Sequence, residues 1–278
     1  MPVKCAICYD FDGTLIRGAM QEYGLIQAFG ITPEKFWKMK ASFAERNNCD
    51  STLAYLYCFA ALAGKQSHEK KRLLSESSLR SFGEKLTYFN GVKDWFQSVN
   101  KAGTEKDIEV EHYIISSGFQ SIIEGSSIAG EISRIFACRY IYDDEGVPVF
   151  PSLVVDSASK IEYLVRISKQ AFESGSDYNA KIPKGERPIP LQNICYIGDG
   201  LTDIPSMAFT KHYGGLSCAV YDPENERVKE IGLRLKNERR VSHCVPADYT
   251  KNGKLFQVIS NFLERIKERK TEDCFIER

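Results

Sequence analysis

The sequence contains no stretch of 18 uninterrupted apolar residues, the minimum that indicates a membrane-spanning helix. It also has no excess of either charge, because 37 lysine and arginine residues balance 37 aspartate and glutamate residues. The N-terminal residues show no apolar segment followed by a small-residue cleavage site, as a secretory signal would. We therefore expect a cytoplasmic protein with no membrane partner. We also expect no nucleic-acid partner, because dedicated nucleic-acid binders carry a basic surface.

The nine cysteines are odd in number, and most lie within apolar runs. This pattern favours buried thiols in a reducing compartment over the disulfide framework of a secreted protein. Cys5 and Cys8 have the C-x-x-C spacing, but they belong to a run that predicts a strand, Val3–Tyr9. Residues three apart on a strand point to opposite faces, so we expect these two thiols neither to share a metal nor to pair.

Hydrophobic residues make up 43% and charged residues 27% of the 278 residues, as in a globular protein. Short apolar runs alternate with longer amphipathic ones, which is the pattern of β-α-β units. We predict an α/β fold with a Rossmann-like, three-layer core around a parallel sheet. Turn residues at 143–146 also predict a small hairpin joining Ile141 to Val149. The predicted strands are Val3–Tyr9, Glu111–Ser116, Ile135–Tyr142, Asn193–Ile197, Leu216–Val220 and Val241–Val245.

A long segment without a strand pattern, roughly Ile16 to Glu109, separates the first two predicted strands. Thr32 and Pro33 within it are suited to be the N-cap and first residue of a helix. We predict an all-helical cap domain, residues 16–90, inserted into a catalytic core formed by residues 1–15 and 91–278. The helical patterns are centred on Met20–Phe29, Pro33–Glu45, Thr52–Ala63, Glu69–Leu86 and Val92–Val99.

Two aspartates, Asp10 and Asp12, directly follow the first predicted strand in the motif D-F-D-G-T. Side chains two apart on a strand share a face, so we expect both carboxylates at the same edge of the sheet. Open α/β sheets bind their ligands at the carboxyl ends of their strands. Two carboxylates this close require a cation between them or a proton on one of them. The motif therefore predicts a polar site at this edge.

A second acidic motif, G-D-G-L-T-D at 198–203, follows another predicted strand and contains Asp199 and Asp203. Carboxylates on separate strands, with positions left for water and phosphate, are a common way for proteins to bind Mg²⁺. Taken alone, Asp203 could instead cap a helix beginning at Ile204. Together with the first motif, the pair favours a metal site.

Ser116, Ser117 and Gly118 end a further predicted strand, and a helix is expected to start at once. Backbone N–H groups and a hydroxyl at such a point form a site for an anion, although serines there are usually only caps. Lys160 is predicted near the start of another helix. It is either a solvated lysine or a cation that offsets the neighbouring carboxylates.

These four motifs, in this order, resemble those of the haloacid dehalogenase-like (HAD) hydrolase superfamily. The resemblance is to the phosphoserine-phosphatase-like branch, whose helical cap lies between the first and second motifs. The order of predicted elements is similar over the whole chain, whereas specific residue matches are confined to the four motifs. It implies a Mg²⁺-dependent phosphatase that hydrolyses a small phosphorylated metabolite through an aspartyl phosphate.

The resemblance also implies a role for each motif residue. Asp10 would be the nucleophile, and Asp12 would protonate the leaving oxygen and then activate water. Mg²⁺ would be bound by the Asp10 carboxylate, the Asp12 backbone carbonyl and Asp199, with Asp203 supporting them from behind. The phosphoryl oxygens would be held by Ser116, Ser117, Gly118 and Lys160.

Asp12 favours phosphate-ester cleavage, because superfamily members that cleave carbon–halogen or carbon–phosphorus bonds lack an aspartate at this place. Two alternatives stay open: a phosphotransferase or mutase, in which an acceptor hydroxyl replaces water, and a catalytically silent binding protein. Glu22 and Arg46 are candidates for cap residues that recognise charged groups of a substrate. The sequence predicts neither the identity of the phosphate ester nor an oligomeric state.

Overall fold

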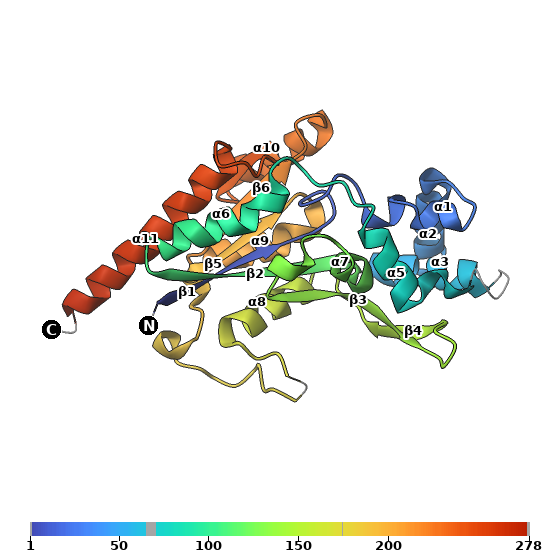
Figure 1. The fold of residues 1–278 in the computed structure, drawn as a ribbon, viewed down its shortest axis with the longest axis horizontal. Helices are drawn as coiled ribbons and strands as arrows, with labels where there is room; N and C mark the ends of the chain where they lie inside the picture. Colours follow the sequence, from blue (N-terminus) through green and yellow to red (C-terminus); the bar gives the residue numbers. More distant parts are fainter. Residues whose placement is uncertain (1, 65–70, 174, 277–278) are drawn as a thin grey trace.

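The computed structural model describes residues 2–64, 71–173 and 175–276 (Figure 1). Seven strands form one sheet in the order β4-β3-β2-β1-β5-β6-β7. All neighbouring strands are parallel except β3 and β4, which form the predicted antiparallel hairpin. The α/β class predicted from the sequence is thus confirmed. The strands are β1 (Val3–Tyr9), β2 (Ile108–Phe119), β3 (Arg134–Tyr142), β4 (Pro148–Leu153), β5 (Ile194–Gly198), β6 (Leu216–Tyr221) and β7 (His243–Pro246).

Helices cover both faces of this sheet and complete a three-layer core. Helices α6 and α11 contact each other on one side of β2, and α8 lies on its other side in contact with α9 (Figure 1). Among the described helices, none is both long enough and apolar enough to cross a bilayer. The core helices are α6 (Val92–Thr104), α7 (Gln120–Glu124), α8 (Ser159–Lys169), α9 (Ile204–His212), α10 (Glu226–Asn237) and α11 (Lys254–Ile276).

The described residues between β1 and α6 form helices and no strand. We call residues 16–64 and 71–90 the helical insertion. Figure 1 shows its helices at the end of the sheet toward which β1 points, away from both chain termini. Of the helix predicted over 69–86, residues 69–70 lie outside the described residues. The insertion helices are α1 (Leu25–Ala28), α2 (Pro33–Asn47), α3 (Ser51–Gly64) and α5 (Glu76–Gly83).

Two chain segments connect the insertion to the core, and they run side by side. The Phe89 N–H donates to the Leu15 carbonyl at 3.1 Å, and Ile16 forms an antiparallel bridge with Tyr88. The predicted boundaries at 15/16 and 90/91 fall at these paired segments. The division into a cap domain and a core domain stays a prediction, and this pairing is where we propose that the two would meet.

Local signals in the sequence account for several element ends. Thr32 Oγ1 accepts a hydrogen bond from the Lys35 N–H at 3.3 Å, and Pro33 is the first residue of α2, as expected. In the β3–β4 turn, Asp143 Oδ1 accepts from two backbone N–H groups, at 3.0 and 2.8 Å. Both are short-range interactions, which is why the sequence alone indicates them.

Strand β2 is longer than predicted, and this changes the region around Ser116. It extends from Ile108, which pairs with Val3, to Phe119, which pairs with Cys138 after an irregularity in the β3 register. The strand does not end at Ser116 as predicted, but a helix does follow Gly118 almost at once, as expected. Pairing with β3 keeps the backbone extended, and α7 begins only at Gln120 and has five residues.

A buried hydrogen-bonded chain joins the central strands to α6. Trp95 Nε1 donates to the Tyr9 hydroxyl at 2.7 Å, and that hydroxyl lies 3.0 Å from His112 Nδ1. His112 Nε2 lies 2.9 Å from Asn100 Oδ1. Because Asn100 Oδ1 only accepts, the ring carries its proton on Nε2 and accepts from Tyr9 through Nδ1. Burial lowers the pKa of His112 to about 3, so the ring is neutral in the folded protein.

This burial predicts a loss of stability in mild acid. In the unfolded chain His112 regains a pKa of about 6.5, so the unfolded state takes up a proton that the folded state excludes as the pH falls below that value. Between pH 7.5 and 5.0 the free energy of unfolding should fall by about 2 kcal/mol from this group. Urea denaturation of His112→Gln at both pH values should show a correspondingly smaller fall than wild type. The exposed His212→Gln variant is the control, and an identical fall in wild type and His112→Gln would contradict the prediction.

Candidate active site

A cavity of about 420 Å³ opens at the carboxyl ends of β1, β2 and β5, between the core and the helical insertion. Gly118 and Asp203, which the sequence also indicated, are not among its described lining residues. The predicted site residues that line it are Asp10, Asp12, Ser116, Ser117, Lys160 and Asp199. Residues distant in the chain are thus brought to one place.

Asp10 and Asp12 reach the cavity in a different way from that predicted. Strand β1 ends at Tyr9, so the alternation of side chains along a strand does not apply to them. The chain turns instead at Gly13, whose φ is +69°, a value that L-residues rarely adopt. A Cβ atom at position 13 would also lie 2.2 Å from Asp199 Oδ2. Glycine is therefore required here for the turn and for the close approach of the second acidic motif.

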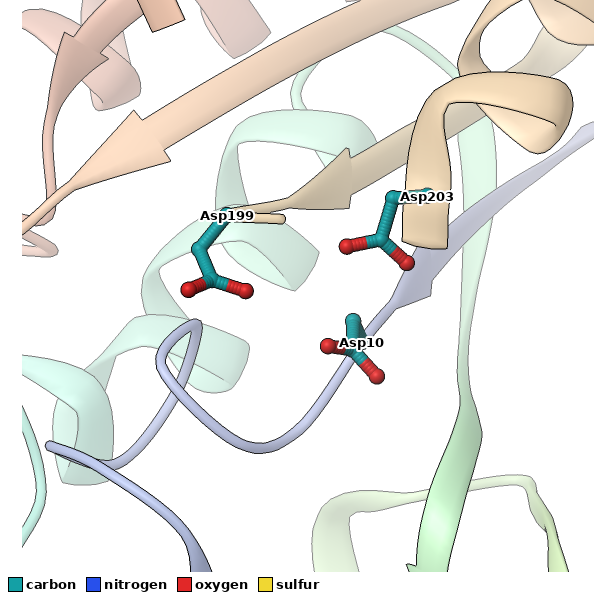
Figure 2. A group of neighbouring side chains, drawn as sticks. All are labelled: Asp10, Asp199 and Asp203. Carbon is teal, nitrogen blue, oxygen red and sulfur yellow. The ribbon is translucent and has the colours of Figure 1, made fainter. Parts of the chain in front are cut away.

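The carboxylates of Asp10, Asp199 and Asp203 surround a common space, as Figure 2 shows. One oxygen from each lies within 4.8 Å of the others. Asp10 follows β1, Asp199 follows β5, and Asp203 ends a short helical turn after it. Hard oxygen donors from separate elements are the type of ligand that Mg²⁺ prefers.

The Asp203 carboxylate accepts hydrogen bonds from three protein donors. Its Oδ1 accepts from Lys160 Nζ at 2.7 Å and from the Tyr196 hydroxyl at 2.7 Å. Its Oδ2 accepts from the Gly200 N–H at 3.2 Å. It makes no side-chain cap to α9, so the alternative of a helix cap does not hold. These contacts favour a positioning role for Asp203 over direct metal binding.

Lys160 is a buried ammonium, not a solvated one. Its side chain is 1% exposed, and its Nζ lies 2.8 Å from Asp10 Oδ1 and 2.7 Å from Asp203 Oδ1. Burial opposes its charge, but the carboxylates of Asp10 and Asp203 outweigh that effect and raise the pKa of Lys160. One oxygen of Asp10 is thereby held, which leaves Oδ2 available to a ligand.

The other carboxylates remain poorly compensated. Burial and the neighbouring Asp203 raise the pKa of Asp10 to about 6, against the effect of Lys160. Burial and Asp10 raise the pKa of Asp12 to about 8. Burial, Asp10 and Asp203 also hold the pKa of Asp199 well above its usual range. A single ammonium does not balance this group, so the donor set fits an additional hard cation.

Two further contacts orient the remaining polar groups. Asp12 Oδ1 accepts from the Met20 N–H of the insertion at 2.8 Å, which leaves its other oxygen toward the cavity free to carry a proton. Ser116 Oγ accepts from the Gly118 N–H at 3.0 Å and keeps its own proton to donate. A Cβ atom at position 118 would lie 2.1 Å from Met20 Cε, so Gly118 allows the insertion to pack here.

Sequence reasoning missed the insertion residues that face this site. Glu22 does not line the cavity and instead accepts from Trp37 Nε1 at 2.6 Å, while Arg46 lines a separate cavity beside Met39. The spacing of Trp37 and Lys40 indicates one face of a helix, but spacing alone does not show which face meets the core. The insertion side chains that line the cavity are Ala19, Gln21, Trp37, Lys40, Asp50, Ser51, Thr52 and Tyr55.

The buried contacts of Lys160 predict a large effect of its removal. Lys160→Met leaves Asp10 and Asp203 without their counter-charge, so the free energy of unfolding should fall by about 3 kcal/mol. Urea denaturation at pH 7.5 measures this change. Lys101→Met, at an exposed position on α6, is the matched control and should change stability little. Equal stability of Lys160→Met and wild type would show that the ion pairs are not formed in solution.

Comparison with other sequences gives little functional information. No protein-family model matches the chain. A protein of Borreliella burgdorferi, described as uncharacterized, is 29% identical over 282 residues, which span 91% of this chain and 94% of its own.

Solved structures are informative about the fold. A phosphoserine phosphatase with a phospho-aspartyl intermediate analogue matches with a TM-score of 0.53 and 16% identity, over 93% of this chain and 99% of its own. A probable phosphoserine phosphatase from Vibrio cholerae matches with 0.54 and 16%, over 96% and 67%. A HAD family hydrolase from Salmonella enterica serovar Typhi matches with 0.54 and 16%, over 88% and 68%. The chain therefore has the haloacid dehalogenase-like fold, in its phosphoserine-phosphatase-like form.

Proposed function

We propose that the protein is a Mg²⁺-dependent phosphatase that hydrolyses a small phosphomonoester through a covalent phosphate on Asp10. The main support for this proposal is the environment of the Asp10 carboxylate, that is, its ion pair with Lys160 and its place in the cavity. Lys160 holds one of its oxygens at 2.8 Å, and the residue lines a cavity together with Asp12 and Ser116. The phosphatase structures named above share this fold, which supports the assignment.

The residues present suit a magnesium ion, which when bound would neutralise charge on the phosphoryl oxygens. The Asp10 and Asp199 carboxylates and the Asp12 backbone carbonyl would hold it. Asp203 would support this arrangement through its contacts with Lys160 and Tyr196. The Ser116 hydroxyl and the Lys160 ammonium would bind the phosphoryl oxygens, beside Ser117 and the Gly118 backbone.

In the first step, a carboxylate oxygen of Asp10 attacks phosphorus and the bond from phosphorus to the ester oxygen breaks. Asp12, protonated, donates its proton to that leaving oxygen, so an alcohol departs. The Met20 N–H holds the other Asp12 oxygen at 2.8 Å and fixes the orientation of the acid. Asp10 now carries the phosphoryl group.

In the second step, water attacks the same phosphorus atom while the Asp12 carboxylate accepts the proton of that water. The bond between phosphorus and the Asp10 oxygen breaks, which releases inorganic phosphate and restores the Asp10 carboxylate. Asp12 ends the cycle protonated, as it began. The same acid therefore serves both steps, and no second general acid or base is needed.

The metal requirement is tested with p-nitrophenyl phosphate as substrate. We expect release of nitrophenolate with Mg²⁺ and its loss with EDTA, with recovery when Mg²⁺ is added back. Asp199→Asn should raise the Mg²⁺ concentration for half-maximal rate at least about tenfold, because it removes a charged ligand. The exposed Asp94→Asn on α6 is the control. Full activity of the wild-type protein in EDTA would refute the metal dependence.

The role of Asp12 is tested by Asp12→Asn, which keeps the shape of the side chain but cannot supply the proton. The turnover number should fall about 10²- to 10⁴-fold, the usual contribution of a general acid, while binding of Mg²⁺ and of substrate changes little. Steady-state kinetics and calorimetric Mg²⁺ titration measure both. Turnover at the wild-type rate would remove Asp12 from the mechanism. Phosphate release that falls below nitrophenolate release when glycerol is added would indicate transfer to an alcohol.

A further inference from the structure

The Gln21 side chain is a buried amide on the insertion side of the cavity. It is 3% exposed and lines the same cavity as Ser116 and Lys160. Among the residues that the structure describes, none donates a hydrogen bond to its Oε1. A buried polar atom without a partner costs about 1–3 kcal/mol, so its place beside a cavity calls for an explanation, and a hydrogen bond from a bound ligand supplies one.

The insertion contributes two other buried side chains to the wall of this cavity, and both are uncharged. Thr52 and Tyr55 are buried and line the same cavity. Burial raises the pKa of Tyr55 well above its usual range, so its hydroxyl stays neutral. The buried insertion side chains of this cavity therefore offer an amide and two hydroxyls, and none of them carries a charge.

Two charged insertion residues, Lys40 and Asp50, also line the cavity, and both have protein partners. The Lys40 ammonium donates to the Ser51 hydroxyl. Asp50 is exposed, and its Oδ1 accepts from the Thr52 and Leu53 N–H groups at 2.7 and 2.9 Å at the start of α3. These contacts already engage both charges, so neither is a free counter-charge for a charged group beside the Gln21 amide.

This wall discriminates between types of leaving group. An ammonium or a carboxylate placed against Gln21 would lose its hydration without gaining a counter-charge, which is costly. A hydroxyl both donates and accepts, so it satisfies the Gln21 amide whichever way the amide is turned. The cavity of about 420 Å³ also has the size of a small-metabolite site.

We propose that Gln21 is a specificity residue, and that the substrate is a phosphomonoester of a neutral polyhydroxylated alcohol, a polyol or a sugar. This inference rests on the proposed phosphatase function and narrows its substrate class. A hydroxyl of the leaving group donates to Gln21 Oε1, and Trp37 provides apolar surface beside it. A phosphorylated amino acid or amine is disfavoured, because the buried part of the wall has no charge to receive it.

The experiment compares kcat/KM of the wild-type protein for glucose 6-phosphate, glycerol 3-phosphate, phosphoserine, phosphoethanolamine and p-nitrophenyl phosphate. We expect one of the two hydroxylated esters to be preferred over both charged esters. For each variant we take kcat/KM for the preferred ester divided by kcat/KM for p-nitrophenyl phosphate. In Gln21→Leu this ratio should fall about tenfold, because only the hydroxylated ester loses a hydrogen bond. Nitrophenol has no hydroxyl beyond the ester oxygen. Gln97→Leu, an exposed glutamine on α6, should leave the ratio unchanged.

Two results would overturn this inference while leaving the phosphatase function intact. One is a preference for phosphoserine or phosphoethanolamine, and the other is an unchanged ratio in Gln21→Leu. If no ester is hydrolysed at all, the proposed function fails and calorimetric titration of glucose 6-phosphate decides the subsite separately. Binding that weakens about tenfold in Gln21→Leu supports the subsite, and binding that is absent or unchanged overturns it.

Discussion

The ammonium of Lys160 is the interaction on which the geometry of the candidate site depends. It bridges Asp10 after β1 and Asp203 after β5, and it comes from α8, an element distant from both in the chain. With one lysine among several buried carboxylates, the site is short of positive charge. That shortage is a liability for the folded chain alone, but it suits a site that takes up a cation together with a phosphate dianion.

The helical insertion is tied to the same centre by its first residues. The Met20 N–H holds Asp12, and the Met20 thioether accepts from the Phe119 N–H at 3.2 Å. Farther out, the Arg17 guanidinium forms ion pairs with Asp222 and Glu224 of the core, at 3.0 and 2.7 Å. The exposed ion pairs contribute little to stability. The buried contacts of Met20, in contrast, couple the orientation of Asp12 to the position of the insertion.

The insertion thus has two parts with different chemistry. The part next to Asp12 orients the acid, while the wall formed by Gln21, Thr52 and Tyr55 faces the space left for the organic group. Because both parts belong to one helical module, the proposed function implies that replacing the module's inner side chains would change which alcohol fits without altering the phosphoryl-transfer residues. This separation is consistent with a common core that serves different substrates.

Much of the core could be predicted from the sequence, because its signals are local. Apolar runs followed by glycine and aspartate indicated β1 and β5, and parallel strands expose ligands at their carboxyl ends, so Asp10 and Asp199 were expected at one edge of the sheet. The extension of β2 beyond Ser116 to Phe119 could not be predicted, because it depends on pairing with β3. The hydrogen-bond partners of Asp203 could not be predicted either, because Lys160 and Tyr196 come close to it only in the folded chain.

The order of the elements, the acidic motifs and the residue types available for phosphate chemistry can all be read from the amino-acid sequence. Which insertion side chains face the cavity cannot, because the rotation of a helix about its axis is set by packing against its neighbours. In the folded chain Gln21 lines the cavity, and Glu22 accepts a hydrogen bond from Trp37. Arg46 lines a separate cavity beside Met39. Long-range packing, and not residue identity, therefore selects the insertion side chains that line the cavity.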